Sequence, residues 1–358
     1  MASGYNEPVR ALTSVLAQAG RPAELMEGSD GSRIVVLPHG GRVIGAFAAG
    51  SRDNFLWNNP SLRNVDSARA LFNSGDWCNT GGDRTWVAPE ADFFRPRYPD
   101  GGAYHQPRSL DPGNYSCARR GSAVVLENRL TLHSYRTGED VLLVVGKVVE
   151  PLSGPPAGED VSKDTRGLAM CGYTLHCSLD VIGGSRGTPV GIWNLLQLPH
   201  GGTMLMPVRA WTHPVTYFGA IPDADLDVGD SLIRWTMRAA GQQKIGLPPG
   251  AVTGRLGYLS GTRDALSLVV RDFPVDPAGL YVDAPMGGSS AQACAVQACS
   301  VHEEALGSFS ELEYHTAAIG GHAEGSRIED TSRVRCFRGP PERIERLAAL
   351  LTGMPRLA

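Results

Sequence analysis

The sequence lacks long apolar runs and any recognisable leader. No stretch of about 18 apolar residues occurs in the 358-residue chain, so we predict no membrane-spanning helix and no membrane partner. The opening residues, MASGYNEPVRAL, lack a basic segment followed by an apolar core, which is the pattern of a secretory signal. We therefore expect a cytoplasmic protein.

Cysteine pairs typical of metal centres or redox motifs are also missing. The seven cysteines are odd in number and form no CxxC pair. Cys171/Cys177 and Cys294/Cys299 are spaced too loosely for an ordinary zinc site. We predict reduced, mostly structural thiols and no bound metal. A set made of His302–Glu304 and His315 is the alternative metal site, and only the fold would bring it together.

A basic surface and the common nucleotide-binding motifs are absent too. Lys and Arg total 33 against 37 Asp and Glu, giving a net charge of −4, so we expect no nucleic-acid partner. Gly183–Gly187 lacks the GK[ST] of a phosphate-binding loop. No GxGxxG and no HExxH occurs. The sequence therefore predicts no cofactor.

What the sequence does contain is a succession of short β runs separated by Gly, Pro, Asp and Asn. Arg33–Leu37 and Arg42–Phe47 flank a Pro-His-Gly-Gly turn and predict a hairpin. Apolar periodicity predicts helices only near the two ends and a short one at Ser67–Phe72. The first end helix is capped by Asn6 and closed by Gly20.

The further strands that we predict are Asn54–Pro60, Ser122–Tyr135, Asp140–Leu152, Gly172–Gly184, Gly191–Val208, Ser231–Met237, Arg255–Ser260, Ala265–Phe273, Gly279–Ala284, Ala295–Glu303 and Phe309–Ala318. Phe93–Tyr115 is expected to be irregular, and Pro151–Asp164 to be an excursion loop and not a domain boundary. The fold class is all-β: one large antiparallel sandwich over residues 1–358, with a cover helix within 1–30 and a second helix at 340–354.

One stretch combines residue types that suit a sugar. Gly81–Glu90, GGDRTWVAPE, contains paired glycines, an Asp-Arg step, a tryptophan and a carboxylate after a proline. Arg84 offers a planar set of donors for sugar oxygens, and Trp86 offers an apolar face for the C–H side of a pyranose. Gly81 and Gly82 permit a turn or a close backbone approach. The alternative is an ordinary turn that leads into a strand.

The order of motifs resembles the galactose mutarotase-like superfamily, and in particular a poorly characterised branch similar to aldose 1-epimerases. The motifs are GGRVIGAF, NFLWNNP, GGDRTWVAPE, GIWNLLQLP, GLYVDA and SELEYH, which together cover most of the chain from Arg33 to the last predicted strand. The resemblance implies a supersandwich of two large antiparallel sheets, with a sugar held in a cleft on the concave sheet.

The resemblance also implies a mechanism. Interconversion of sugar anomers needs a base for the O1 proton and an acid for the ring oxygen, for which a carboxylate and a histidine are suited. Glu313 in SELEYH matches the base, and Glu311 points to the same face of the strand. His105 and His176 are the two histidines that we expect in the place of the acid. Arg84 matches the arginine that holds sugar oxygens.

Seven residues besides Arg84 and Glu311 are expected to bind substrate, or alternatively to serve the fold. Trp193 and Gln197 share one face of a predicted strand, although a tryptophan in the core is as common. The others are Asp83 beside Arg84, Trp86, Glu90 after Ala88-Pro89, Lys244 after a predicted strand, and Asp283 at the end of a predicted strand. Lys244 is suited to an anionic substituent.

Three functions fit these residues. The first is an aldose 1-epimerase-like isomerase acting on sugar anomers or epimers. The second is a lyase or hydrolase acting on a modified glycoside on the same fold, and the third is a carbohydrate-binding protein without catalysis. In each case the partner is a small carbohydrate or glycoside. Neither the particular sugar nor the oligomeric state, a homodimer included, follows from the sequence.

Overall fold

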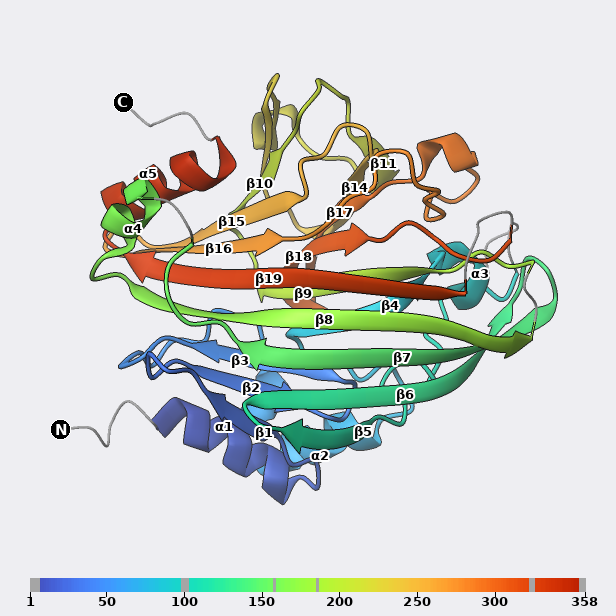
Figure 1. Ribbon diagram of the computed structural model, residues 1–358, viewed down its shortest axis with the longest axis horizontal. Helices are drawn as coiled ribbons and strands as arrows, with labels where there is room; N and C mark the ends of the chain where they lie inside the picture. Colours follow the sequence, from blue (N-terminus) through green and yellow to red (C-terminus); the bar gives the residue numbers. More distant parts are fainter. Residues whose placement is uncertain (1–6, 98–102, 157–158, 185–186, 322–325, 354–358) are drawn as a thin grey trace.

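Two large antiparallel sheets face each other in the computed structural model, which describes residues 7–97, 103–156, 159–184, 187–321 and 326–353 (Figure 1). One sheet has nine strands in the order β1-β2-β3-β4-β9-β18-β17-β14-β11. The other has ten in the order β12-β13-β10-β15-β16-β19-β8-β7-β6-β5. The expected all-β sandwich is confirmed.

The strands of the nine-stranded sheet are β1 (Glu24–Glu27), β2 (Arg33–Leu37), β3 (Arg42–Phe47), β4 (Asp83–Ala88), β9 (Gly191–Pro199), β18 (Gly307–His315), β17 (Val296–Glu303), β14 (Gly241–Leu247) and β11 (Val215–Phe218). Those of the ten-stranded sheet are β12 (Leu226–Val228), β13 (Leu232–Thr236), β10 (Thr203–Pro207), β15 (Arg255–Gly261), β16 (Leu266–Asp272), β19 (Arg327–Gly339), β8 (Ala169–Gly184), β7 (Glu139–Pro151), β6 (Ala123–Ser134) and β5 (Ser116–Arg120).

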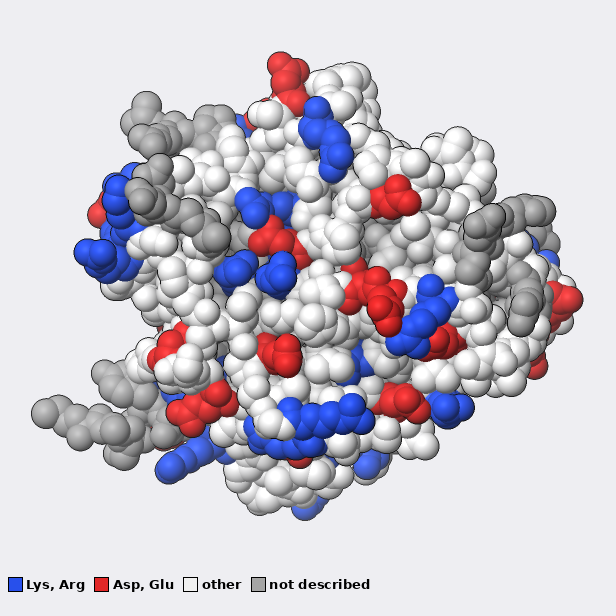
Figure 2. All heavy atoms as spheres, in the orientation of Figure 1, with Lys and Arg blue, Asp and Glu red and all other residues white. Residues whose placement is uncertain are grey.

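The ten-stranded sheet has one face in the core and one in solvent. Along β6, Leu126, Leu130 and Leu132 are buried while Glu127 and Arg129 are exposed, which is the period-two pattern of a half-buried strand. The outward face carries basic and acidic side chains in mixed order (Figure 2). This alternation explains why the sequence pattern found β6, β7 and β8.

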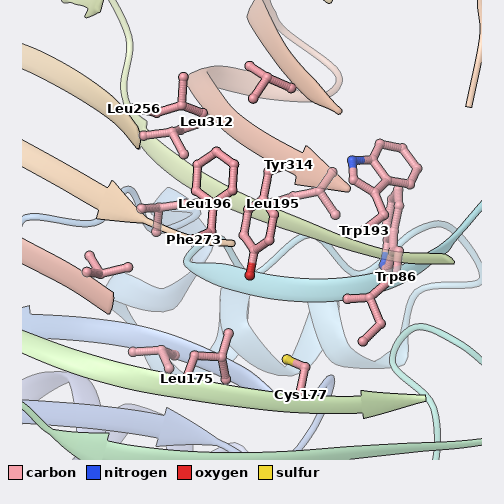
Figure 3. Packing of buried hydrophobic residues seen from close by; sticks show 14 of the residues in the cluster. Trp86, Leu175, Cys177, Trp193, Leu195, Leu196, Leu256, Phe273, Leu312 and Tyr314 are labelled. Atoms are coloured by element: carbon pink, nitrogen blue, oxygen red, sulfur yellow. The ribbon is translucent and has the colours of Figure 1, made fainter. Parts of the chain in front are cut away.

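The nine-stranded sheet is covered on both faces at its centre. In β4 and β9, all residues but the last of β9 are buried. One face packs on the other sheet, where Leu175 and Cys177 of β8 lie opposite Leu196 and Tyr314 (Figure 3). The second face is covered by irregular segments that leave a space above the sheet.

Helices cover the margins. They are α1 (Glu7–Gln18), α2 (Val65–Asn73), α3 (Glu90–Phe94), α4 (Glu159–Thr165) and α5 (Pro341–Thr352), with 3-10 turns η1 (Pro60–Arg63), η2 (Asp223–Asp225) and η3 (Ser290–Gln292). Among the described residues, no helix is both long and apolar enough to span a bilayer. All seven cysteines are free thiols.

Several predicted elements are confirmed and others are wrong. The β2–β3 hairpin has the predicted bounds, and α1, α2 and α5 lie where periodicity placed them, although the predicted cap Asn6 lies outside the described residues. Asn54–Pro60 and Gly279–Ala284 are not strands. In the first segment Asn54 Oδ1 accepts from Ala46 N and Leu56 N, and in the second Leu280 O and Asp283 O accept single bonds from Ala318 N and Cys294 N in place of a ladder. Part of the expected loop Pro151–Asp164 belongs to α4.

Candidate functional site

A cavity of about 600 Å³ lies against the face of the nine-stranded sheet that points away from the other sheet. Thr85 Oγ1 donates to Asn194 Oδ1 at 2.7 Å and lies 3.6 Å from Cys177 Sγ of β8, so Thr85 and Asn194 face the ten-stranded sheet. Neighbouring strand residues point to opposite faces, which puts Arg84 and Trp193 on the cavity side.

Six strands and several loops contribute to the lining. The residues are Arg84, Trp86, Trp193, Leu195, Phe309, Glu311, Val301, Gln242, Lys244 and Phe218 from the sheet, and Gly75, Asp76, Trp77, Glu90, Arg95, Tyr104, His105, Gln106, Arg108 and Leu306 from the covering segments.

Paired glycines fix the start of the strand that carries Arg84. Gly81 and Gly82 have φ values of +90° and +77°, and a Cβ on either would lie 2.3 Å or 2.2 Å from a backbone oxygen. This close approach lets Gly82 N donate to Trp57 O at 2.9 Å, and lets Gln197 N donate to Gly82 O at 2.9 Å. The register of β4 against β9 follows, and with it the position of Arg84.

Arg84 lies at the centre of the cavity floor. Its Nη2 is 2.8 Å from Glu311 Oε1, and Gln197 Nε2 donates to the same oxygen at 3.0 Å. Its guanidinium carbon lies 4.3 Å from the ring centre of Trp86 and 5.1 Å from that of Trp77. Arg84 Nε and Nη1 are buried and have no hydrogen-bond partner among the described residues. Two donors thus remain for a ligand.

Glu313 lies beside this pair and is fully buried. Trp193 Nε1 donates to Glu313 Oε2 at 2.8 Å, and Lys244 Nζ lies 3.1 Å from the same oxygen. Burial raises the pKa of Glu313 to about 7; Lys244 and the Trp193 donor oppose the rise and Glu311 adds to it. Glu313 Oε1 accepts no hydrogen bond within the part of the chain described.

Lys244 lies between Glu313 and Glu90, which belongs to the segments that cover the sheet. Its Nζ also lies 3.6 Å from Glu90 Oε2, and 4.5 Å from the ring centre of Trp193. Burial alone lowers the pKa of Lys244, but the carboxylates of Glu313, Glu90 and Asp283 outweigh it and raise the pKa. The ammonium therefore stays charged across the physiological range.

Asp283 fixes the segment that carries Glu90. Its Oδ1 accepts from Glu90 N at 2.7 Å, and its Oδ2 accepts from Gln297 Nε2 at 2.6 Å. Asp283 thus ties α3 to β17 and holds Glu90 over the sheet. Asp283 is 2% exposed and does not line the cavity, so it supports Glu90 from behind the cavity wall. It lies in a loop and not at the end of a strand, where it was expected.

The expected residues separate into three groups. Arg84, Trp86, Glu90, Trp193, Lys244, Glu311 and His105 line the cavity. Glu313, Gln197 and Asp283 lie behind the lining and contact it. Asp83 and His176 are elsewhere. Asp83 points between the sheets, where it pairs with Arg271 at 3.0 Å and accepts from Tyr173 Oη at 2.7 Å.

His176 lies on the ten-stranded sheet. Its Nδ1 is 2.8 Å from Thr331 Oγ1 and its Nε2 is 3.6 Å from Glu150, with the side chain 43% exposed. Its neighbours Leu175 and Cys177 are buried in the core, so His176 faces solvent on the outer side. The expected pairing of His176 with Glu313 is absent from the described contacts.

Contributions from two residues, Asp111 and His315, were not expected from the sequence. Asp111 accepts from Trp77 Nε1 at 3.1 Å and Trp86 Nε1 at 3.0 Å, and so orients two cavity walls. His315 stacks on Trp193 with ring centres 5.3 Å apart, and burial lowers its pKa to about 4. The signal for His315 was present, since it shares strand parity with Glu311 and Glu313. Asp111 has no comparable signal because it lies in an irregular loop.

Cys299, Glu311 and Glu313 each have one atom that could coordinate a metal ion, and these three atoms lie within 4.8 Å of one another. The residues fit a metal poorly. Arg84 and Lys244 already neutralise the two carboxylates at 2.8 Å and 3.1 Å, and burial with these carboxylates raises the pKa of the Cys299 thiol. The cluster therefore resembles a balanced ion-pair network.

Similar folds occur among solved structures at very low sequence identity. A candidate aldose 1-epimerase from Klebsiella pneumoniae is 8% identical, with 94% of this chain and 88% of that chain covered and a TM-score of 0.46. An aldose epimerase homologue from Caenorhabditis elegans is 8% identical, with 89% and 99% covered and a TM-score of 0.40. The galactose 1-epimerase of Lactobacillus acidophilus is 8% identical, with 88% and 94% covered and a TM-score of 0.38.

The search of curated proteins finds no match for this chain. A family model does match, and it covers residues 9–355, which is nearly the whole sequence. The chain therefore belongs to DUF6786, a family of unknown function.

Proposed function

We propose that the cavity binds a sugar and that the protein interconverts sugar anomers, in the manner of an aldose 1-epimerase. The observation that carries the proposal is the set of buried polar atoms that have no partner among the described residues, namely Arg84 Nε and Nη1 in the cavity lining and Glu313 Oε1 just behind it. A buried polar group without a partner is costly, and a ligand that both donates and accepts would satisfy donors and acceptors together. Sugar hydroxyls do both.

The walls suit the rest of a sugar ring. Trp86 and Trp193 lie next to each other (Figure 3), with ring centres 5.3 Å apart. Both line the cavity, as Arg84 does. Aromatic faces take the C–H side of a pyranose, while the polar floor takes its hydroxyls. A cavity of about 600 Å³ falls in the range of small-molecule sites, which supports a ligand of monosaccharide or disaccharide size.

In the proposed reaction Glu313 is the base. A carboxylate whose pKa lies near 7 is well matched to taking and returning a proton at neutral pH. Arg84 holds the sugar oxygens, and Lys244 keeps the ionised form of Glu313 stable at 3.1 Å. Removal of the O1 proton by Glu313 and protonation of the ring oxygen by an acid break the C1–O5 bond. The open chain then rotates about C1–C2, and the reverse steps give the other anomer.

Proton NMR of freshly dissolved aldoses tests the proposal. The wild-type protein is expected to accelerate the equilibration of anomeric signals for at least one sugar. Glu313→Gln is expected to lower that rate by about 10²–10⁴-fold. The matched control is Glu329→Gln, an exposed glutamate on β19 that should keep the wild-type rate.

Other results would point to the other functions. Equal activity of Glu313→Gln and wild type would contradict the assigned base. An ultraviolet-absorbing unsaturated product from a modified glycoside would indicate a lyase, and release of a free sugar would indicate a hydrolase. Tight binding of sugars with no product from any of them would indicate a carbohydrate-binding protein.

A further inference from the structure

We propose that Glu90 is the acid that acts together with the base Glu313 in this site, and that Lys244 couples the two carboxylates. Glu90 thus takes the role that the sequence resemblance gives to a histidine. The inference rests on the proposed function for its reaction, but the pairing itself can be measured without turnover. Four observations on the described residues lead to it.

The first observation is the position of Glu90. It opens α3, lines the cavity from the side opposite the sheet floor, and has a side chain that is 19% exposed. Its backbone N–H is held by Asp283 Oδ1 at 2.7 Å, and Gln297 Nε2 fixes Asp283 at 2.6 Å. Glu90 is therefore a carboxyl group that is partly accessible and is held in place by its segment. A group that must meet a substrate needs both properties.

The second observation is the bridge through Lys244. Nζ lies 3.1 Å from Glu313 Oε2 and 3.6 Å from Glu90 Oε2, and Lys244 itself lines the cavity. A ligand oxygen that accepts a hydrogen bond from Nζ is thus placed beside both carboxyl groups. The substrate's anomeric and ring oxygens are both attached to C1, so one sugar can present them to the two carboxyl groups.

The third observation is the balance of charge. Arg84 and Glu311 neutralise each other at 2.8 Å, and Glu90 and Glu313 share the Lys244 ammonium at 3.6 Å and 3.1 Å. Two carboxylates that share one cation in a buried site retain one proton between them. Burial raises the pKa of both groups; at Glu90 Lys244 opposes the rise and Asp283 adds to it. A pair with one proton is the state that acid–base catalysis needs.

The fourth observation concerns the histidines. His176 faces solvent on the other sheet. His105 lines the cavity but is exposed, in the segment that follows α3, and no described hydrogen bond joins its ring to Glu313 or Lys244. His315 is buried behind Trp193 and does not line the cavity. Glu90, by contrast, contacts the same ammonium as Glu313.

The proton transfers balance within the pair. The Glu90 carboxyl gives its proton to the ring oxygen while the C1–O5 bond breaks, and the Glu313 carboxylate takes the O1 proton. The open-chain aldehyde then rotates about C1–C2. On closure, O5 attacks C1 and returns its proton to Glu90 while Glu313 reprotonates O1. One carboxylate is ionised throughout, and Lys244 lies beside whichever one it is.

The groups that face the pair define its pH dependence. Around Glu90 they are Lys244 from β14, Asp283 from the loop after β16, and Arg95 after α3. Around Glu313 they are Lys244, Glu311 on its own strand and the Cys299 thiol of β17, together with the Trp193 donor. The active state carries one proton on the pair. The rate is therefore expected to fall both when the pair gains a second proton and when it loses the last one.

The kinetic test compares Glu90→Gln, Glu313→Gln and His105→Gln with the control Glu329→Gln. Glu90→Gln is expected to lower kcat by about 10²–10³-fold and to abolish the alkaline limb of the pH–rate profile. His105→Gln is expected to cost less than about tenfold and to keep both limbs. A Glu90→Gln enzyme that keeps its alkaline limb and the wild-type kcat would overturn the proposal.

A titration tests the pairing without any substrate. With ¹³C-labelled glutamate, the carboxyl signal of Glu90 is followed against pH in the wild type, in Glu313→Gln and in Glu329→Gln. Loss of the Glu313 charge leaves Lys244 to Glu90 alone, so the pKa of Glu90 is expected to fall by about one unit. An unchanged Glu90 pKa would overturn the coupling. If no sugar reacts with the wild type, the anomer reaction fails, while the titration still decides whether the pair exists.

Discussion

Arg84 and Glu311 form a buried ion pair in which Nη2 lies 2.8 Å from Oε1. The two residues are 227 positions apart in the chain, and they lie on β4 and β18, which flank β9 in the nine-stranded sheet. The pair uses one edge of the guanidinium. The other nitrogens, Nε and Nη1, are left without a partner among the described residues. A planar guanidinium held in this way presents a fixed set of donors to the cavity.

Arg84→Lys should therefore weaken sugar binding while it keeps the charge that faces Glu311. An ammonium cannot reproduce the two remaining donors or the stacking on Trp86 and Trp77. Loss of one hydrogen bond from a charged donor costs about 1.5–3 kcal/mol, so Kd should rise roughly 10- to 100-fold. Calorimetric titration with a sugar that the wild type binds measures this change in Kd. Arg327→Lys, at an exposed pair on β19, is the control, and an equal Kd for Arg84→Lys would exclude Arg84 from the binding site.

Trp193→Phe should shift the acid limb of the pH–rate profile to higher pH. The indole N–H donates to Glu313 Oε2 at 2.8 Å and so stabilises the ionised form of a carboxyl group whose pKa is about 7. Without this donor the pKa of Glu313 rises, by about one to two units if the hydrogen bond contributes 1.5–3 kcal/mol. The rate at pH 6 should then fall more than the rate at pH 9. Trp211→Phe, at an exposed tryptophan, should leave the profile in place.

The sequence pattern predicted the strands that have one face in solvent and the hairpin whose turn chemistry is local. β6, β7, β8 and the β2–β3 hairpin were found for this reason. Edge and short strands such as β5, β11 and β12 were missed, and so was β19. Apolar alternation is weak in β5, β11 and β12, which have few buried residues, and β19 pairs with β16 and β8, which are far away in the chain. Lys244 was placed after a strand, but it lies within β14.

The site was predicted where strand parity decides it. Arg84 with Trp86, and Glu311 with Glu313, share a face because they are two residues apart. Parity also explains why Asp83 cannot join Arg84 in the cavity. The positions of His176 and His105 could not be derived, since they depend on the sheet to which a strand belongs and on the course of a long loop. The same holds for Glu90, whose contact with Lys244 crosses from α3 to β14.

His176→Gln should leave sugar binding and turnover within about twofold of the wild type. The side chain lies on the outer face of the ten-stranded sheet, with Thr331 at 2.8 Å and Glu150 at 3.6 Å, and both contacts are partly exposed. Exposed pairs of this kind contribute about 0–1 kcal/mol to stability, so the variant should also fold normally. The NMR assay that detects anomer exchange decides the matter. A tenfold loss of activity from correctly folded protein would return His176 to the catalytic site.

Asp83→Asn should destabilise the fold and leave sugar affinity unchanged in the protein that remains folded. Asp83 and Arg271 are fully buried between the sheets, 3.0 Å apart, and Tyr173 Oη donates to the same carboxylate at 2.7 Å. Removal of one charge of a buried pair leaves the other unpaired, which costs about 3–5 kcal/mol. Urea unfolding measures the loss, with Asp53→Asn at an exposed pair as the control, where less than about 1 kcal/mol is expected.

The double variant Asp83→Leu/Arg271→Met separates the two roles that Asp83 was given. If the pair only supports the fold, replacing both charges by apolar side chains should restore part of the stability that Asp83→Asn loses, because no buried charge is then left without a partner. Sugar affinity should stay at the wild-type value in both variants, since Asp83 points away from Arg84 across the strand. A loss of affinity without a loss of stability would instead place Asp83 in the binding site.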